Sequence, residues 1–315
     1  MREEKKLIFI VPCYNEEETL EYTAGKLIKK LEGLIRNGAV SKDSGICFVD
    51  DGSTDDTRRI LSNLADTDKR VLLINLSRNY GQQYALLAGI KTVDADMVIT
   101  IDADLQDSLD SVDEMVAKYH EGFEIVYGCR DKRIGDTLLK RITAAIFYKV
   151  MSLICTRTYH NHSEYRLLSR KAISFLKEFN EREIFLRGMI SDVGLRSATI
   201  IYNRTARTMG KTKYNYFALF KLAWTGISNY SFFPLRLISI LGLVFVLISL
   251  SAFMVMLVYY LNTDSIERLL ILLSFMGFFS GFIILSIGLL GEYIAKILRE
   301  VKGRPTFQID STKNC

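Results

Sequence analysis

The sequence has 315 residues, enough for one large domain or two small ones, and 49% of them are hydrophobic. The net charge is +5 at pH 7, and no dense basic run with interleaved aromatic residues occurs, which argues against nucleic-acid binding and fits an anionic membrane surface better. The five cysteines form neither a CxxC pair nor a Cys/His metal spacing. They therefore predict no disulfide framework and a reducing, cytosolic setting for the polar part of the chain.

From residue 7 to about residue 130, short apolar runs alternate with helical patterns. Five runs have the continuous hydrophobicity of buried strands: 7–12, 46–51, 71–76, 97–102 and 124–130. The helical patterns between them cover 16–38, 55–66, 80–93 and 111–122. This alternation predicts a parallel sheet with helices on both faces. The first run is too short for a signal peptide, so we expect a strand there.

Polar residues gather where three of these predicted strands end. The clusters are Pro12, Tyr14, Asn15 and Glu16 after the first strand, Asp50, Asp51, Gly52 and Ser53 after the second, and Asp102 and Asp104 after the fourth. A single cluster of this kind is ordinary turn chemistry. Three at successive strand ends predict one crevice, since ligands bind outside the carboxyl ends of such strands. Because the sequence has no glycine-rich phosphate loop, a nucleotide must be held in another way.

The stretch ITIDADLQD (99–107) places three aspartates and a glutamine at the end of the fourth predicted strand. Carboxylates this close repel one another and are costly to bury unless a positive charge neutralises them. A solvated acidic turn is one explanation, and a divalent cation that holds a phosphorylated ligand is the other. Oxygen ligands of this type suit Mg²⁺ or Mn²⁺.

Four stretches from residue 134 onward have the character of membrane-associated segments. Residues 134–156 combine basic side chains with a broad apolar face, which fits either a core helix or a helix in the membrane interface. The aromatic stretch 214–236 has the same character and contains the single tryptophan, Trp224. Residues 237–261 and 269–291 are free of charge and long enough to span a bilayer. They predict a membrane hairpin, with a buried pair of core helices as the alternative.

The charges around the hairpin predict its orientation. Arg236 precedes the two apolar runs, and Lys296, Arg299, Lys302 and Arg304 follow them, whereas the link between the runs carries little positive charge. By the positive-inside tendency, both ends face the cytosol. We therefore expect a multi-pass protein of the inner (plasma) membrane, with residues 1–213 as a cytosolic domain and 292–315 as a cytosolic tail.

Several short motifs, in this order, resemble a known family. They are VPCYNEEETL, FVDDGSTDDT, LSRNYGQQYALLAG, ITIDADLQD, YRLLSR, RTMGKTKY and GEYIAKILREVKGRP, and they extend from about residue 7 to 306. Together they resemble the family 2 glycosyltransferases of the GT-A fold, and within them the polyprenyl-phosphate branch that includes bactoprenol glucosyltransferases and dolichol-phosphate mannose synthases. The resemblance implies a Rossmann-like α/β domain with a mostly parallel sheet, interfacial amphipathic helices and a C-terminal two-helix hairpin.

The resemblance also implies an activity and its partners. The reaction is the inverting transfer of a sugar from a nucleotide-sugar, with a UDP-hexose such as UDP-glucose as the expected donor, to undecaprenyl phosphate for cell-envelope glycan modification. The cofactor is Mg²⁺ or Mn²⁺. Membrane lipid and a second copy of the chain are further expected partners, and a flippase and a downstream glycosyltransferase would act in the same pathway.

Site residues follow from the positions that match the family motifs. The resemblance assigns the nucleotide-sugar to Pro12, Tyr14, Glu16, Asp50, Asp51, Asp102 and Arg130, and the metal to Asp102, Asp104 and Gln106. It assigns the lipid phosphate to Arg166, Arg207 and Lys213, and catalysis to Glu164, Asp104, Arg207 and Lys213. Arg130 and Arg78 fit a role as salt-bridge partners equally well.

Two positions depart from the family pattern. Relatives read DLQDPP where this chain has Ser108 and Leu109, and they carry an aspartate where this chain has Glu164. A lipid phosphate is mostly dianionic at neutral pH, so its attack needs no obligatory base. We therefore expect Glu164 to position the acceptor or to be linked to the metal; a surface glutamate without a function is the alternative.

Other functions are compatible with part of this pattern. A non-catalytic nucleotide-sugar-binding membrane scaffold of the same fold is the main alternative, because of the departures at Ser108 and Glu164. A processive polysaccharide synthase would share the aspartate motifs, but this sequence has no QxxRW motif and too few apolar runs. A membrane-anchored nucleotidyltransferase is disfavoured by the absence of a glycine-rich phosphate loop.

Overall fold

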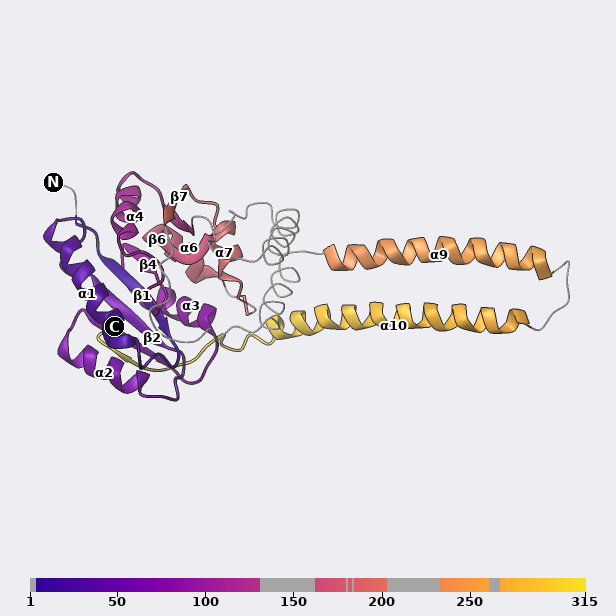
Figure 1. Cartoon of the computed structure of the whole chain (residues 1–315), viewed down its shortest axis with the longest axis horizontal. Coiled ribbons are helices and arrows are strands. Elements are labelled where there is room, and N and C mark those ends of the chain that lie inside the picture. Colours follow the sequence, from indigo (N-terminus) through magenta and orange to yellow (C-terminus); the bar gives the residue numbers. More distant parts are fainter. Residues whose placement is uncertain (1–3, 131–161, 180, 183, 203–232, 261–266) are drawn as a thin grey trace. The chain divides into compact units, whose positions relative to one another are not determined.

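The computed structural model describes residues 4–130, 162–179, 181–182, 184–202, 233–260 and 267–315 (Figure 1). The chain divides into two units, Met1–Ala223 with Pro305–Cys315, and Trp224–Arg304, which are treated separately below.

The first unit is built on an eight-stranded sheet of the described residues. Its strands are β1 (Leu7–Cys13), β2 (Gly45–Asp50), β3 (Val71–Leu76), β4 (Met97–Thr100), β5 (Ile125–Arg130), β6 (His162–Ser169), β7 (Ser197–Tyr202) and β8 (Ile309–Lys313). Their order across the sheet is β7-β5-β6-β4-β1-β2-β3-β8. The neighbours β4, β1, β2 and β3 are parallel, while β6 lies antiparallel between β4 and β5 and β8 lies antiparallel to β3. The predicted mostly parallel sheet is thus confirmed.

Helices cover both faces of this sheet. The helices α1 (Leu20–Arg36), α2 (Thr57–Thr67) and α4 (Ser111–His120) contribute to one apolar cluster. The helices α3 (Gln82–Thr92), α6 (Arg170–Glu178) and α7 (Leu186–Asp192) contribute to a second cluster on the opposite face. Successive strand residues enter the two clusters alternately, as Phe9 and Ile10 of β1 do. Buried strands with two apolar faces explain the continuous hydrophobic runs of the sequence.

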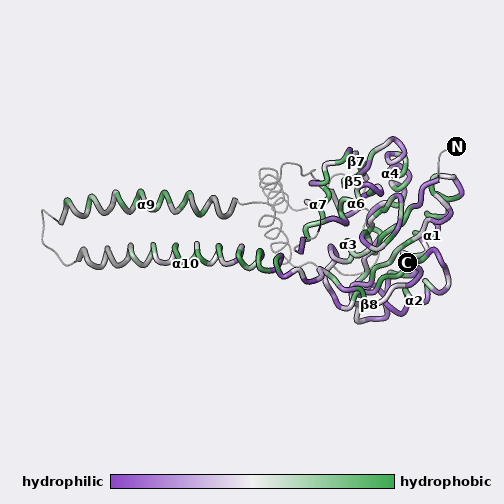
Figure 2. The backbone as a smooth tube through the Cα atoms, turned by 180° about the vertical axis from the view of Figure 1, so that it is seen from behind, coloured by the Kyte–Doolittle hydropathy of each residue, from purple (hydrophilic) through white to green (hydrophobic). Residues whose placement is uncertain are grey.

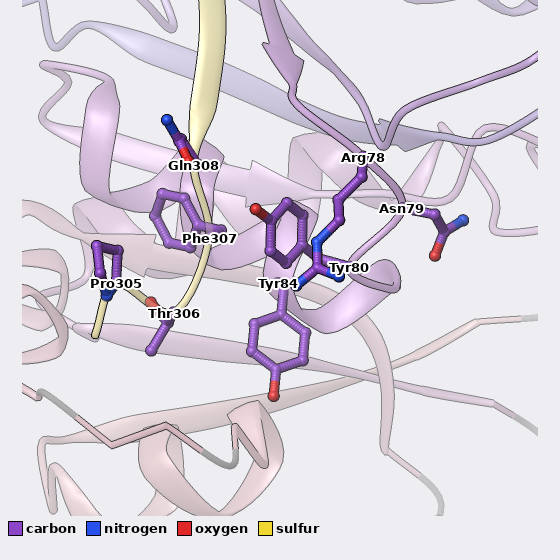
Figure 3. A pocket seen from close by; sticks show the side chains of 8 residues that line it. All are labelled: Arg78, Asn79, Tyr80, Tyr84, Pro305, Thr306, Phe307 and Gln308. Atoms are coloured by element: carbon purple, nitrogen blue, oxygen red, sulfur yellow. The ribbon is translucent and has the colours of Figure 1, made fainter. Parts of the chain in front are cut away.

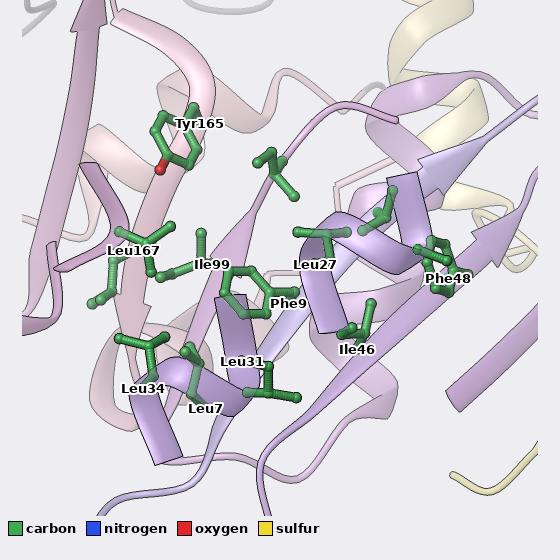
Figure 4. Packing of buried hydrophobic residues seen from close by; sticks show 14 of the residues in the cluster. Leu7, Phe9, Leu27, Leu31, Leu34, Ile46, Phe48, Ile99, Tyr165 and Leu167 are labelled. Carbon is green, nitrogen blue, oxygen red and sulfur yellow. The ribbon is translucent and has the colours of Figure 1, made fainter. Parts of the chain in front are cut away.

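The first of these clusters joins the centre of the sheet to α1. Phe9 of β1, Leu27 of α1 and Ile46 of β2 are completely buried and lie in the same packed layer (Figure 4). Because such side chains are removed from water on both sheet faces, the strands are held at fixed positions. The loops at their carboxyl ends therefore start from a rigid base.

The strand β8 was not predicted from the sequence. Residues 309–313, within the stretch that the sequence analysis described as a tail, pair with β3 and extend the sheet by one edge strand. Asn75 Nδ2 donates a hydrogen bond of 2.9 Å to Ser311 Oγ, and Lys313 Nζ contacts Asp66 Oδ2 at 2.6 Å. The polar sequence IDSTK gives little strand signal, because an edge strand outside the core needs no run of apolar residues.

The second unit contains the two long helices α9 (Phe233–Tyr260) and α10 (Glu267–Val301), which lie side by side (Figures 1 and 2). They contact each other through Phe245 of α9, whose ring centroid lies 5.2, 6.1 and 5.0 Å from those of Phe278, Phe279 and Phe282. Among the described residues, the segment Phe278–Val301 is long and apolar enough to cross a membrane.

These helices correspond to the two apolar runs of the sequence, 237–261 and 269–291. That both of them cross the membrane stays a prediction. The predicted interfacial helix at 134–156 lies outside the described residues, as does 214–232 of the second one, and residues 233–236 begin α9.

Candidate active site

The loops after β1 and β2 are joined by hydrogen bonds at the carboxyl edge of the sheet. Asn15, with a left-handed backbone (φ 53°), donates its backbone N–H to Ser53 Oγ at 3.0 Å. Its side chain accepts the Thr54 backbone N–H at 2.8 Å. Next to it, the Glu16 backbone N–H donates to Thr57 Oγ1 at 2.8 Å. Two of the three predicted polar clusters thus form one connected rim, as the sequence analysis expected.

The two aspartates after β2 have different surroundings. Asp50 is completely buried; its Oδ1 accepts the Ser53 N–H at 3.1 Å, and its Oδ2 has no hydrogen-bond partner among the described residues. The carboxylate of Asp51 accepts the backbone N–H groups of Tyr80 (2.7 Å) and Gly81 (2.8 Å). Burial raises the pKa of the Asp51 carboxyl, although the two backbone hydrogen bonds lower it. Asp51 therefore holds the turn before α3, whereas Asp50 offers an oxygen acceptor that a ligand can satisfy.

The aspartates after β4 lie at the same edge. Asp102 Oδ1 accepts a hydrogen bond of 2.7 Å from Gln82 Nε2, and Asp104 Oδ1 accepts the Gln106 N–H at 3.2 Å. Leu105, between Asp104 and Gln106, has a left-handed backbone conformation (φ 45°), so the chain turns tightly here. Within the described ranges, no group of three or more His, Cys, Asp or Glu residues could hold a metal by itself. A cation at Asp102 and Asp104 would therefore need further oxygen ligands from Gln106, a substrate or water.

The third aspartate of the stretch has a structural role. Asp107 is buried, and its carboxylate accepts the hydroxyl hydrogen bond of Tyr202 in β7. Tyr165 of β6 packs edge-on against Tyr202, with ring centroids 5.3 Å apart, and its hydroxyl donates to the Ser108 carbonyl at 3.0 Å. These contacts hold the loop at Ser108, where the family pattern has proline.

A carboxylate held by two arginines lies next to the aspartates. Arg166 of β6 pairs with Thr100, the last residue of β4. Asp102 follows Thr100 by two residues and is close enough for its charge to raise the pKa of Arg166. One Glu164 oxygen accepts from the Arg166 guanidinium, and Oε1 accepts from Arg187 Nε at 2.7 Å. The side chain of Arg166 is 0% exposed and that of Glu164 is 11% exposed. Burial lowers the pKa of Arg166, whereas Glu164 raises it.

Arg187 and its support are residues that the sequence analysis missed. Arg187 is the second residue of α7, and the first, Leu186, donates its backbone N–H to Gln83 Oε1 at 3.1 Å. Gln83 follows Gln82, which contacts Asp102. The motif LSRNYGQQ contains both glutamines, but the sequence alone gave no partner for either of them.

Other predicted site residues differ in how far the structure describes them. Pro12 is half-buried in β1, Tyr14 is exposed, and Glu16 is half-buried at the rim of the crevice. Arg130 ends β5, but its side chain is outside the description, and Arg207 and Lys213 lie outside the described residues altogether.

A pocket of about 470 Å³ lies beside the turn that Asp51 holds (Figure 3). It is lined by Arg78, Asn79, Tyr80 and Tyr84 and by the segment 305–308 that leads into β8. The Arg78 guanidinium stacks over the Tyr80 ring, with its Cζ 4.8 Å from the ring centroid. The Ser77 N–H donates to the Gln308 carbonyl at 3.0 Å, which joins the two walls.

The family is decided by a sequence comparison. The model of glycosyl transferase family 2 matches residues 8–176, which include every described strand end of the site. The chain belongs to glycosyltransferase family 2. This membership, together with the mostly parallel mixed sheet, confirms the predicted GT-A fold.

This glycosyltransferase has relatives that match it over nearly its whole length. A bactoprenol glucosyl transferase of Shigella phage SfX is 35% identical and covers 98% of this chain and 100% of its own. The uncharacterized glycosyltransferase YkoT of Bacillus subtilis is 38% identical over 96% of this chain and 91% of its own. Among solved structures, glucosyl-3-phosphoglycerate synthase from Mycobacterium tuberculosis, in complex with Mn²⁺, UDP and phosphoglyceric acid, is 18% identical, with a TM-score of 0.44 over 70% of this chain and 75% of its own.

Proposed function

We propose that this glycosyltransferase moves a sugar from a nucleotide-sugar to a polyprenyl phosphate. A UDP-hexose such as UDP-glucose is the donor, and undecaprenyl phosphate is the acceptor. The observation that carries the proposal is the 35% identity, over 98% of the chain, to a protein named bactoprenol glucosyl transferase. That alignment includes the apolar C-terminal helices as well as the catalytic sheet.

The carboxyl edge of the sheet suits a nucleotide diphosphate and a divalent cation. Asp50 has a buried oxygen with no partner in the described part of the chain, and the exposed Tyr14 follows Cys13, the β1 residue that pairs with Asp50; both fit the nucleoside. Asp102, Asp104 and Gln106 offer only oxygen ligands, which suit Mg²⁺ or Mn²⁺. When bound, such a cation neutralises the charge that develops on the diphosphate leaving group.

The reaction needs no proton transfer before the attack. An oxygen of the lipid phosphate forms a bond to the anomeric carbon, and the bond from that carbon to the β-phosphate oxygen of UDP breaks. UDP leaves with the electron pair, and the anomeric configuration is inverted. The lipid phosphate is mostly dianionic at neutral pH, so it arrives as a competent nucleophile. Arg207 and Lys213 are the cations that we expect near the two phosphorylated substrates. Arg166, which was predicted to bind the lipid phosphate, is completely buried and would act on the substrates only through Glu164 and Arg187.

We propose that the apolar helices anchor the enzyme in the membrane, where the lipid phosphate is held. In this proposal α9 and α10 both cross the bilayer, and the sheet lies on the cytosolic side, where nucleotide-sugars are available. The positive charges at Arg236 and after residue 291 support this orientation.

The test is UDP release by the purified chain in detergent, with undecaprenyl phosphate, Mg²⁺ or Mn²⁺, and a panel of sugar donors. We expect turnover of one donor, and a loss of at least about a hundredfold in Asp104→Ala, because the charge of the leaving group is no longer stabilised. Glu164→Asp should retain activity, since the family pattern that the sequence resembles has aspartate at this position. No UDP release with any donor, alongside intact nucleotide binding, would instead favour the non-catalytic scaffold.

A further inference from the structure

The contacts of Glu164 are those of a structural bridge between two arginines. One of its oxygens accepts from Arg166, which is completely buried, and the other accepts from Arg187 Nε at 2.7 Å. Each oxygen of Glu164 thus accepts a hydrogen bond from a guanidinium group, and these two charge-assisted bonds fix the carboxylate between the arginines. The side chain is therefore placed to hold Arg187, with Arg166 as its buried anchor.

Arg187 itself is fixed from two directions. Its guanidinium contacts Glu164, and its helix begins at a backbone N–H that Gln83 Oε1 accepts at 3.1 Å. The contact through Nε fixes the plane of the guanidinium, and a planar fork of N–H donors matches the oxygens of a phosphate. The side chain is 31% exposed, unlike that of Arg166, so solvent and a substrate can reach it.

The cluster also lies within electrostatic reach of Asp102. Burial lowers the pKa of Arg166, whereas the charges of Glu164 and Asp102 raise it. A phosphate bound at Arg187, which shares Glu164 with Arg166, would therefore lie on the side of the site that carries the proposed metal ligands.

We propose that Arg187 binds the phosphate of the polyprenyl acceptor, and that Glu164 is the positioning residue that orients it. The inference rests on the proposed function for the identity of the acceptor. It adds a residue that the family motifs did not assign, and it gives a physical role to Glu164. Extending the side chain by one methylene relative to aspartate leaves this role intact, because a bridging carboxylate needs only to reach both arginines.

The test compares variants of the full-length chain in detergent. Arg187→Gln should raise the KM for undecaprenyl phosphate about 10- to 100-fold and leave the KM for the sugar donor unchanged, because a charge-assisted hydrogen bond to the acceptor is lost. Arg187→Lys should restore part of the affinity. Glu164→Gln should also raise the acceptor KM, with an unchanged pH profile of kcat. The matched control is Arg170→Gln, since Arg170 pairs with Asp94 and Asp96 beside the other end of β4.

A second measurement is independent of turnover. Titration calorimetry compares the binding of geranyl phosphate with that of geraniol, and Mn²⁺-dependent UDP binding reports the folded state of each variant. Wild type should prefer the phosphate, and Arg187→Gln should lose that preference while it still binds UDP.

Each outcome has a separate meaning. An unchanged acceptor KM and phosphate preference in Arg187→Gln would overturn the inference. Loss of kcat in Glu164→Gln, together with loss of the acidic limb of its pH profile, would overturn it in favour of a general base. A wild type that prefers geranyl phosphate but transfers no sugar would overturn the proposed function and leave the phosphate site standing.

Discussion

Two adjacent aspartates at the end of β2 serve different purposes. Both oxygens of Asp51 accept hydrogen bonds from the backbone N–H groups of Tyr80 and Gly81. In contrast, the buried Oδ2 of Asp50 accepts no hydrogen bond from the described residues. Both were predicted to contact the nucleotide. Removal of Asp51 would release the turn before α3, whereas removal of Asp50 would take an acceptor from the crevice. Similar kinetic losses in the two variants would thus have different causes.

The C-terminal thiol is expected to be more reactive than the other described thiols. The hydrogen bond from Cys47 lowers the pKa of Cys315 to about 7, whereas burial raises the pKa of Cys13. Cys315 is exposed, so its thiolate form, which increases as the pH rises through 7, is accessible to reagents. We expect iodoacetamide to alkylate Cys315 first, with half of the maximal rate near pH 7.

Peptide mass spectrometry over pH 5.5 to 9.5 measures the rate at each cysteine. In Cys47→Ala the midpoint of the Cys315 rate should move toward the ordinary thiol pKa near 8.5, because the hydrogen bond is lost. A midpoint near 8.5 in the unmodified chain would contradict the prediction.

The sequence predicted the residue types of the site better than their contacts. Asp102, Asp104 and Asp50 could be placed at strand ends, because the end of an apolar run marks the edge of the sheet. The partners of Glu164 could not be inferred, since Arg187 lies 23 positions away and joins the site only through the packing of α7. A contact between distant segments depends on tertiary structure, and no local pattern in one sequence reports it.

At the scale of elements, the start of α3 supports two parts of the site. Gln82 donates to Asp102 Oδ1 at 2.7 Å, and Gln83 accepts the N–H of Leu186 at 3.1 Å, at the start of α7. Gly81, immediately before them, has φ 103°, a conformation that side chains rarely adopt. Two successive side chains therefore hold Asp102, a proposed metal ligand, and the helix that carries Arg187.

These two contacts can be separated by matched substitutions. Gln82→Met keeps the length of the side chain but removes the donor to Asp102, so the metal concentration for half-maximal activity should rise about 10- to 100-fold. Gln83→Met should leave the metal requirement unchanged and raise the KM for the lipid phosphate. Metal and acceptor titrations of UDP release measure both effects. Equal shifts in both variants would contradict separate roles.

The elements differed in how well the sequence predicted them. The strands β1 to β5 are flanked by buried layers and show continuous apolar runs, which the sequence analysis identified within a few residues. The strand β6 carries Glu164 and Arg166, so charge interrupts its apolar pattern. The strand β8 lies at the sheet edge and is polar. Where the site or the solvent determines the residues of a strand, the hydrophobic signal is lost.

At the scale of the whole molecule, the sheet is built from both ends of the chain. The strand β8 pairs with β3, although more than 200 residues and the helices α9 and α10 separate them. Without β8, the outer edge of β3 would expose unpaired backbone groups. Residues 309–313 are therefore part of the catalytic sheet.

Removal of residues 309–315 should loosen β3 selectively. We expect amide hydrogen exchange in 71–76 to become about tenfold faster or more, while β1 at the centre of the sheet keeps its protection. Mass spectrometry of peptides from the two strands gives the comparison. The control Asp310→Asn alters only an exposed ion pair with Arg58 and should leave the exchange of β3 unchanged. Equal acceleration in β1 and β3 would indicate general unfolding instead.

The position of β8 also sets the order in which the protein can be completed during translation. The ribosome makes β1 to β7 first, then α9 and α10, and only afterwards the last strand of the sheet. The catalytic sheet therefore cannot be complete when its first seven strands emerge, and its final edge closes only after both apolar helices have been synthesised. If those helices enter the bilayer as they are made, a finished catalytic sheet exists only on chains that already have their anchor.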